Sequence, residues 1–134
     1  MRLVLPLLAG LALPALAAAQ PQVPRATIEL NRLEARAEGC RVWLLLRNPA
    51  SFAHERLRLD LLLFGRDGVI ARRIVVDAGA LPAEKTMARI FDAPGLRCED
   101  IGSLLLNDIP LCAGENCLAR FDTASRVPDV ALER

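Results

Sequence analysis

From Thr27 onward the chain is a series of short apolar runs separated by turn residues, and this spacing constrains the fold more than any other feature. Short runs bounded by Gly, Pro, Asn and Asp are typical of β-strands, and many of them in succession are typical of an all-β sandwich or barrel. No stretch combines a helical period with helix caps. The runs therefore predict seven strands, at residues 27–35, 41–47, 56–64, 69–77, 86–91, 102–107 and 118–123.

This number of strands is that of an immunoglobulin-like β-sandwich, so we expect an all-β fold of this class with about seven strands. Residues 42–46 are apolar on both faces of their strand, which predicts a central position in a sheet. Trp43 is accordingly expected to pack in the core. Trp43 closely follows Cys40, which is not the arrangement of cysteine and tryptophan in antibody domains, so an antibody-type domain is not expected.

The strongest local signal is a β-hairpin within residues 57–76. Asp67 and Gly68 lie between its two runs, and this pair suits the positive backbone angles of a tight hairpin turn. With these two residues as the loop, Arg58 meets Asp77 on one face and aliphatic side chains pair on the other. A four-residue loop would keep similar cross-strand pairs. The sequence therefore predicts which side chains share a face of the hairpin more firmly than it predicts the turn type. The predicted aliphatic pairs are Leu59 with Val76 and Leu61 with Ile74.

The N-terminus has the three parts of a secretory signal peptide. Arg2 gives a positive start, residues 3–16 form an apolar run, and Ala17 and Ala19 supply the small residues of a cleavage site. The run is shorter than the roughly 20 residues needed to span a bilayer, and prolines interrupt it. We expect cleavage after Ala19 and no stable membrane anchor afterwards. No arginine pair precedes the run, which favours the general secretory route.

Removing residues 1–19 from the 134-residue chain leaves 115 residues, which suits one domain with one core. Without Arg2 the mature chain carries 16 basic and 16 acidic side chains. Nucleic acids and anionic lipids require concentrated positive charge, so neither is expected as a partner. The predicted division is a signal peptide at residues 1–19, a flexible proline-rich start at 20–25, a β-sandwich domain at 26–126 and a loosely ordered tail at 127–134.

Four cysteines lie in a chain addressed to an oxidising compartment, where an even number normally forms disulfides. Three connectivities are possible. Cys112 and Cys117 flank a short polar stretch with a glycine, so a local bridge is sterically easy, which leaves Cys40 with Cys98 as a long-range bridge. Chain entropy gives the long loop roughly 4 kcal/mol and the short loop roughly 2 kcal/mol. The spacing matches neither a zinc ribbon nor a C-x-x-C redox pair, so structural disulfides are expected rather than a metal site.

Three stretches of the mature region, together with the cysteines, resemble known proteins: TIELNRLE at residues 27–34, LDLLLFGRDGVIARR at 59–73 and IGSLLLNDIP at 101–110. Through them the chain resembles an uncharacterised family of bacterial secreted proteins labelled Tat pathway signal sequence domain proteins. A weaker similarity links it to FxLYD-type and fibronectin-like sandwich modules. The resemblance implies export and a sandwich fold, and it carries no catalytic or binding residues across.

Residues suited to catalysis or metal binding are sparse. The one histidine is His54, in a loop with Ser51 near it in sequence. We expect His54 to be a solvated loop side chain, since no nucleophile elbow, phosphate-binding loop or H-E-x-x-H pair occurs. A copper carrier needs clusters of Met and His, whereas the mature chain has one methionine, Met87, and one histidine, His54. The pairs Glu99–Asp100 and Asn107–Asp108 are expected to be turn residues rather than calcium ligands.

Three hypotheses for the function follow, in order of preference. The first is a non-catalytic module of the bacterial envelope, periplasmic or secreted and without a cofactor, whose loops or edge strand contact another protein or a glycan. The second is a small periplasmic hydrolase or metal carrier that uses His54. The third is an inhibitor or accessory subunit that acts through the Cys112–Cys117 loop.

Overall fold

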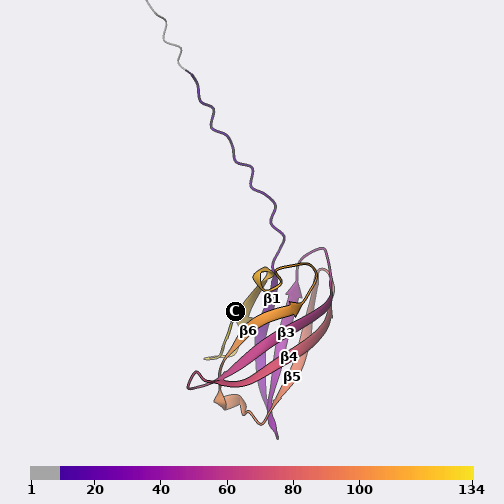
Figure 1. Cartoon of the computed structure of the whole chain (residues 1–134), viewed down its shortest axis with the longest axis vertical. Coiled ribbons are helices and arrows are strands. Elements are labelled where there is room, and N and C mark those ends of the chain that lie inside the picture. Colours follow the sequence, from indigo (N-terminus) through magenta and orange to yellow (C-terminus); the bar gives the residue numbers. More distant parts are fainter. Residues whose placement is uncertain (1–9) are drawn as a thin grey trace, which may run out of the picture.

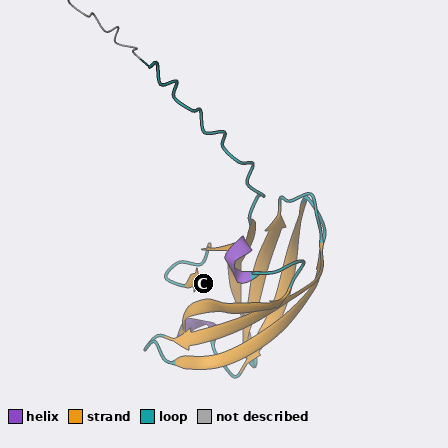
Figure 2. Cartoon of the chain, turned by 45° about the horizontal axis from the view of Figure 1, so that its top comes forward, coloured by secondary structure: helices purple, strands orange, loops and turns teal. Residues whose placement is uncertain are grey.

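The computed structural model describes residues 10–134 and shows a β-sandwich of two four-stranded sheets (Figures 1 and 2). Residues 1–9, which include the positive start of the predicted signal peptide, lie outside the described residues. Residues 10–25 have no regular secondary structure and extend away from the sandwich (Figure 1). Across residues 10–134 no helix is long and apolar enough to cross a membrane. The elements are β1 (Ala26–Arg36), β2 (Gly39–Asn48), β3 (His54–Gly65), β4 (Ile70–Leu81), β5 (Lys85–Pro94), η1 (Cys98–Asp100), β6 (Ile101–Leu111), η2 (Leu118–Arg120), β7 (Phe121–Ser125) and β8 (Ala131–Glu133), where η marks a short 3-10 helix.

The two sheets draw their strands from along the whole domain. The first sheet has the order β5-β2-β1-β7, and the second has the order β4-β3-β6-β8. Neighbouring strands are antiparallel, except that β7 is parallel to β1 and β8 is parallel to β6. Strand β2 lies inside its sheet, as its two apolar faces predicted. The all-β sandwich is thus confirmed, and residues 10–134 contain eight strands rather than the predicted seven.

The core lies between the two sheets and is built from alternate residues of each strand, since successive side chains of a strand point to opposite faces. The central strands β2 and β3 supply much of it, and Phe121 of β7 is a fully buried aromatic residue. The buried aliphatic residues of these two strands are Val42, Leu44 and Leu46 in β2 and Leu57, Leu59, Leu61 and Leu63 in β3.

The β3–β4 hairpin has the predicted register, but its turn differs. The Gly65 N–H donates to Val69 O at 2.8 Å and the Gly68 N–H donates to Gly65 O at 3.0 Å, with Gly68 at φ 79°. This is the three-residue loop closed by a left-handed glycine, rather than the two-residue loop. A bulge in β4 compensates, because one extra residue separates the partners of Leu63 and Phe64. The confirmed pairs are Leu59 with Val76, Leu61 with Ile74 and Arg58 with Asp77.

The C-terminal segment corrects two predictions. The strand expected at 118–123 begins later, because η2 occupies Leu118–Arg120 and β7 starts at Phe121. The tail is not loosely ordered, since β8 pairs with β6, and Val130 and Leu132 are buried in the core. A strand as short as β8 shows no alternating pattern in the sequence, and its burial depends on a pairing with a distant strand.

The two disulfides lie at opposite ends of the sandwich. Cys40–Cys98 joins the start of β2 to η1, and Cys112–Cys117 closes a loop that follows β6. Strand β6 runs from one end to the other, since Cys98 lies just before it and Cys112 just after it. These are the pairings that the spacing favoured. We call the first the hairpin end (the β1–β2 turn, η1 and Cys40–Cys98) and the second the loop end (the β2–β3 loop, Cys112–Cys117 and η2).

Arginine side chains bridge the open side of the sandwich between β4 and β5. Arg89 of β5 donates to the carbonyl oxygens of Ala78 at 2.5 Å and Ala80 at 3.0 Å, both on β4. Arg72 of β4 donates to the carbonyl oxygen of Pro94 at 3.3 Å. Free carbonyl groups at a sheet edge are the acceptors that an added strand uses. These contacts therefore block part of the β4 edge.

Candidate functional site

The loop end brings together His54 and the Cys112–Cys117 loop, which the sequence presented as separate candidates. His54 is the first residue of β3 and is only 3% exposed. Its ring centroid lies 5.5 Å from that of Phe52 and 5.1 Å from that of Phe121. The expected solvated position is therefore wrong, because two aromatic rings and the disulfide loop cover the imidazole.

His54 holds the disulfide loop through its Nδ1 atom. The backbone N–H of Ala113 donates to Nδ1 at 3.1 Å, so a neutral imidazole carries its proton on Nε2. Burial, together with the nearby Arg120 charge, lowers the pKa of His54 below its ordinary value of 6.5. Ser51 is exposed in the β2–β3 loop, and the Nδ1 atom that a serine hydroxyl would need already has a partner.

Arg120 lies against the disulfide. Its Nη2 donates to Cys112 Sγ at 3.1 Å and also to the carbonyl oxygen of Ala113. Among residues 10–134 its side chain forms no ion pair with a carboxylate, and its Nε is buried without a hydrogen-bond partner. A guanidinium with a spare donor and no counter-charge therefore faces the Cys112 sulfur.

Sequence reasoning missed Arg120 because only the local turn places it. The Arg120 N–H donates to Cys117 O at 3.0 Å and closes η2, which turns the chain back over the disulfide loop. A strand that began at Leu118, as predicted, would instead have extended the chain away from this loop. The available signal was a basic residue shortly after Cys117. The sequence is rich in arginine, so a basic residue close to a cysteine does not by itself indicate a contact.

Asn48 fixes the β2–β3 loop beside this cluster. Its Nδ2 donates to the carbonyl oxygens of Phe52 at 2.8 Å and Pro82 at 3.1 Å, and its Oδ1 accepts from the Ala50 N–H at 3.1 Å. A cavity of about 100 Å³ lies next to the loop, with His54 in its wall. Small-molecule sites have volumes of roughly 300 Å³ or more, so this cavity is too small for an ordinary organic ligand.

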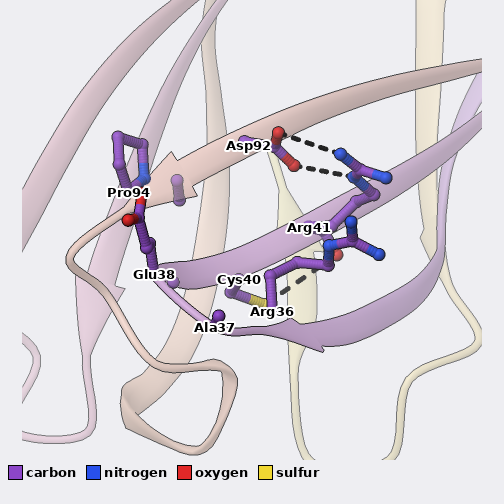
Figure 3. A pocket seen from close by; sticks show the side chains of 9 residues that line it. Arg36, Ala37, Glu38, Cys40, Arg41, Asp92 and Pro94 are labelled. Carbon is purple, nitrogen blue, oxygen red and sulfur yellow. Dashed lines mark hydrogen bonds and ion pairs between the residues drawn. The ribbon is translucent and has the colours of Figure 1, made fainter.

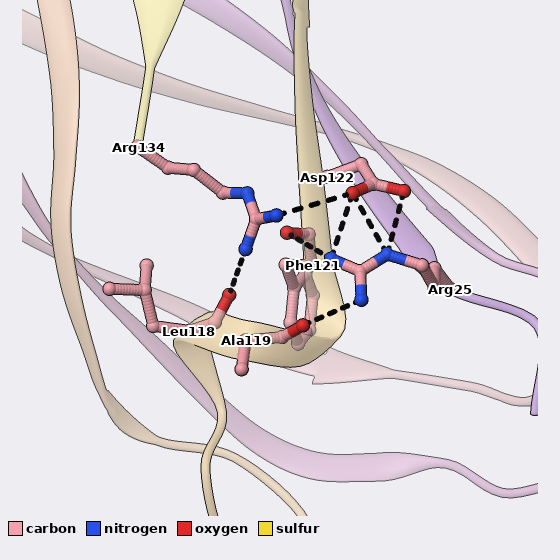
Figure 4. Close-up of polar contacts among 6 residues, drawn as sticks. All are labelled: Arg25, Leu118, Ala119, Phe121, Asp122 and Arg134. Carbon is pink, nitrogen blue, oxygen red and sulfur yellow. Dashed lines mark hydrogen bonds and ion pairs between the residues drawn. The ribbon is translucent and has the colours of Figure 1, made fainter.

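Arg25 ties the start of β1 to the loop end (Figure 4). Its Nε donates to both carboxylate oxygens of Asp122 at 2.9 Å, and its Nη1 donates to Ala119 O at 2.6 Å. The hydrogen bond from Arg25 lowers the pKa of Asp122. Arg134 donates to Leu118 O at 3.2 Å and lies 3.8 Å from Asp122. The start that was expected to be flexible is thus fixed at its last residue.

The hairpin end holds a larger cavity, of about 310 Å³ (Figure 3). Its wall includes the β1–β2 turn and the Arg41–Asp92 ion pair, whose atoms lie 2.8 Å apart. The hydrogen bond from Arg41 lowers the pKa of Asp92. Gly39 permits the turn to approach β5, since a Cβ there would lie 2.3 Å from Ala93 O. These charges neutralise each other, and we assign the cavity no ligand.

The first sheet carries apolar side chains on its outer face. Trp43 and Leu45 of β2 are half-buried, and Ile90 of β5, the cross-strand partner of Trp43, is 46% exposed. The expectation that Trp43 packs in the core is wrong, because its position alternates with the buried residues of β2. Its Nε1 donates to Glu34 at 2.8 Å, and this hydrogen bond lowers the pKa of Glu34.

The second sheet has a comparable apolar group on its own outer face. Asp60 lies beside this group and is 4% exposed, held by Arg73 at 2.9 Å and Asn107 at 2.9 Å. Hydrogen bonds from Arg73 and then Asn107 lower the pKa of Asp60. The apolar members are Leu62, Phe64, Ile70, Val75 and Leu105.

The other residues weighed as metal ligands are engaged elsewhere. Glu99 and Asp100 both contact Arg97, at 2.6 Å and 3.1 Å. Asn107 and Asp108 lie within strand β6, so the expectation that they are turn residues is wrong. Asn107 donates to Asp60, and Asp108 accepts from the Ile109 N–H at 2.8 Å. Within the part of the chain that the structure describes, no three His, Cys, Asp or Glu side chains are grouped so as to hold a metal ion.

No protein-family model, no curated protein and no solved structure matches this chain.

Proposed function

We propose that this protein is an exported, non-catalytic binding module of immunoglobulin-like type that binds an acidic protein surface of the bacterial envelope. The pairing order β5-β2-β1 is compatible with strands E, B and A of such a sandwich, and the neighbours β3 and β6 are compatible with C and F, which supports this type. Two pairings depart from that plan, since β7 lies parallel to β1 in the first sheet and β8 lies parallel to β6. Two disulfides are compatible with an oxidising compartment.

The observation that carries this proposal is the apolar group Trp43, Leu45 and Ile90 on the outer face of the first sheet. Tryptophan and arginine are enriched at the centres of protein interfaces, and a ring of polar residues that excludes water normally surrounds them. Arginines outnumber carboxylates around this group, so an acidic partner complements it. The ring contains Arg32, Arg36, Arg41, Arg47 and Arg126 with Glu29, Glu34 and Asp92.

Binding through this face is favoured over addition of a strand at a sheet edge. Arg89 already occupies the carbonyl oxygens of Ala78 and Ala80 on the β4 edge. Of the other edge strands, β7 has 5 residues and β8 has 3, which leaves little backbone for a partner strand. The fourth edge strand, β5, has 10 residues, and arginines donate to its Ala88 and Pro94 carbonyl oxygens. A sheet face needs no free backbone groups.

The outer face of the second sheet serves as an internal control. It is also apolar and also carries ion pairs, such as Arg73–Asp60 and Arg58–Asp77, but it lacks tryptophan. Phe64 on β3 matches Trp43 on β2, because both are half-buried aromatic residues on the outer face of an interior strand.

The test is a binding measurement with Trp43→Ala and the control Phe64→Ala. The purified protein is cross-linked in an envelope extract of the bacterium that encodes it, and the captured protein is then purified and titrated by calorimetry. Loss of a central aromatic residue costs about 2 kcal/mol or more at an interface, so Trp43→Ala should raise Kd at least about 30-fold. Phe64→Ala should leave Kd within about threefold, as most residues outside the interface core do.

Equal effects of the two substitutions, or no effect of Trp43→Ala, would refute this binding face. Binding to purified peptidoglycan that depends on Trp43 would replace the protein partner with a glycan. Ile90→Asp with the control Val75→Asp repeats the comparison on the two edge strands, where both side chains are about half exposed, at 46% and 50%.

A further inference from the structure

We infer that Cys112–Cys117 is an exchangeable disulfide that reacts with a thiol of a dithiol protein, with Cys117 as the sulfur attacked and Cys112 as the thiolate released beside Arg120. This site lies at the loop end, whereas the binding face proposed above lies on the first sheet. The inference does not depend on that face.

The position of Arg120 favours a thiolate at Cys112. A disulfide sulfur is a weak hydrogen-bond acceptor, whereas a thiolate next to a guanidinium forms a charge-assisted hydrogen bond. Arg120 Nη2 already lies 3.1 Å from Cys112 Sγ, and in the described chain Arg120 has no carboxylate partner and a buried, unpartnered Nε. Cleavage of the bridge would therefore supply the negative charge that this guanidinium lacks.

Access to the two sulfurs differs in the direction that this reaction requires. Cys117 lines an open groove of about 720 Å³ together with Asp108, Pro110, Leu118 and Arg134. Cys112 does not line this groove, and its contact with Arg120 is partly buried. The rate of exchange depends on access to the attacked sulfur and on the stability of the thiolate that leaves. An incoming thiolate in the groove reaches Cys117 and displaces Cys112.

The loop is held in place independently of the disulfide. The Ala113 N–H donates to His54 Nδ1, and Ala113 O accepts from Arg120. Because His54 is buried between Phe52 and Phe121, this anchor belongs to the sandwich rather than to the loop. Cys112 is thus retained beside Arg120 after the bridge opens, in position for the disulfide to form again.

The steps balance in atoms and electrons. A thiolate of the dithiol protein attacks Cys117 Sγ, a new S–S bond forms, and the electron pair of the broken bond remains on Cys112 Sγ. The second thiol of the partner loses its proton to water and attacks the partner's first sulfur, which is bonded to Cys117 in the mixed disulfide. Cys117 leaves as a thiolate and takes up a proton. The partner is oxidised to a disulfide, and this chain is reduced by two electrons.

The first test uses glutathione as the thiol probe on the unmodified protein. After brief reaction and acid quenching, peptide mapping should locate glutathione on Cys117, with Cys40–Cys98 intact. Adducts mainly on Cys112, or opening of Cys40–Cys98 before the loop bridge, would overturn the inference. This arm needs no variant and is valid whatever a substitution does to folding.

The second test measures the rate of bridge opening in Arg120→Gln, with Arg134→Gln as the matched control. Arg134 lines the same groove but contacts Leu118 O rather than a sulfur. Arg120→Gln should slow opening by about tenfold, because exchange rates depend on the stability of the leaving thiolate, while Arg134→Gln should leave it nearly unchanged. Equal slowing in both would indicate general attraction of anionic glutathione and would refute the role of Arg120. Trp43→Ala should not alter the rate of bridge opening, so the proposal for this disulfide and the proposal for the binding face are tested independently.

Discussion

The two ends of this sandwich are each closed by a disulfide, yet the surroundings of the two bridges are opposite in character. At the hairpin end, Cys40 is 1% exposed and belongs to the core, and the nearby charges of Arg41 and Asp92 are paired. At the loop end, both cysteines are half-buried, and an arginine without a carboxylate partner in the described chain faces one sulfur.

The difference separates stability from reactivity. Cys40–Cys98 spans 58 residues and Cys112–Cys117 spans 5, so the first removes much more freedom from the unfolded chain. The short bridge contributes less to folding and is surrounded by groups that stabilise its cleaved form. The long bridge thus ties β2 to the η1 segment that precedes β6, and the short bridge is available for chemistry.

The largest effect is expected from removing the long bridge. The double substitution Cys40→Ala with Cys98→Ala should lower the free energy of unfolding by about 4 kcal/mol, because the unfolded chain regains the freedom of a long loop. Denaturant titration with a tryptophan fluorescence readout measures this change. A loss no greater than that of the short bridge would contradict the assignment of the hairpin end as the structural one.

Removing the short bridge should have about half this effect. Cys112→Ala with Cys117→Ala should lower the free energy of unfolding by about 2 kcal/mol. The protein should still fold, since His54 and Arg120 continue to hold Ala113. Circular dichroism and the same denaturant titration measure the outcome, and a chain that no longer folds would show that both bridges are structural.

How far the sequence predicted these two ends depends on the range of the interactions involved. Cross-strand pairs such as Leu59 with Val76 follow from alternation and a nearby turn, so their register could be predicted. The disulfide pairing could also be predicted from the sequence. Cys112 and Cys117 are close together in the chain, and Cys40 and Cys98 are the two that remain. The hairpin register depends on one continuous segment, and the disulfide pairing depends only on the spacing and number of the cysteines.

The burial of His54 and the position of Arg120 could not be predicted in this way. His54 is covered by Phe121 and by the disulfide loop, which is brought to it from far along the chain by β6. Arg120 reaches the disulfide only because η2 replaces the expected strand. Strand β8 was missed for a related reason, since its pairing with β6 is non-local.

A smaller effect is expected from His54→Gln. The substitution removes the imidazole that accepts from Ala113 and packs on Phe121, at a cost of about 1 kcal/mol for a buried N–H that loses its acceptor. Amide hydrogen exchange should show faster exchange at residues 112–117 and unchanged protection around Cys40. Faster exchange at both ends would mean that His54 supports the whole sandwich rather than the loop.

The smallest effect concerns pH. The pKa of His54 is lowered in the folded chain, first by burial and then by Arg120. The unfolded chain therefore binds more protons between the lowered pKa and 6.5, so stability is full above pH 6.5 and falls as the pH drops through this window. Thermal unfolding of the wild type and His54→Gln across this range should give a slope that the variant lacks. A wild-type slope of the opposite sign would contradict a buried, neutral imidazole.

The contrast between the two ends is tested most directly by counting both disulfides in one sample. The protein is equilibrated in a series of dithiothreitol concentrations, alkylated, and mapped by mass spectrometry, with circular dichroism recorded on the same samples. The loop bridge should open first, with the sandwich still folded and Cys40–Cys98 intact. Simultaneous opening of both bridges with loss of the fold would show that the two ends do not differ as described.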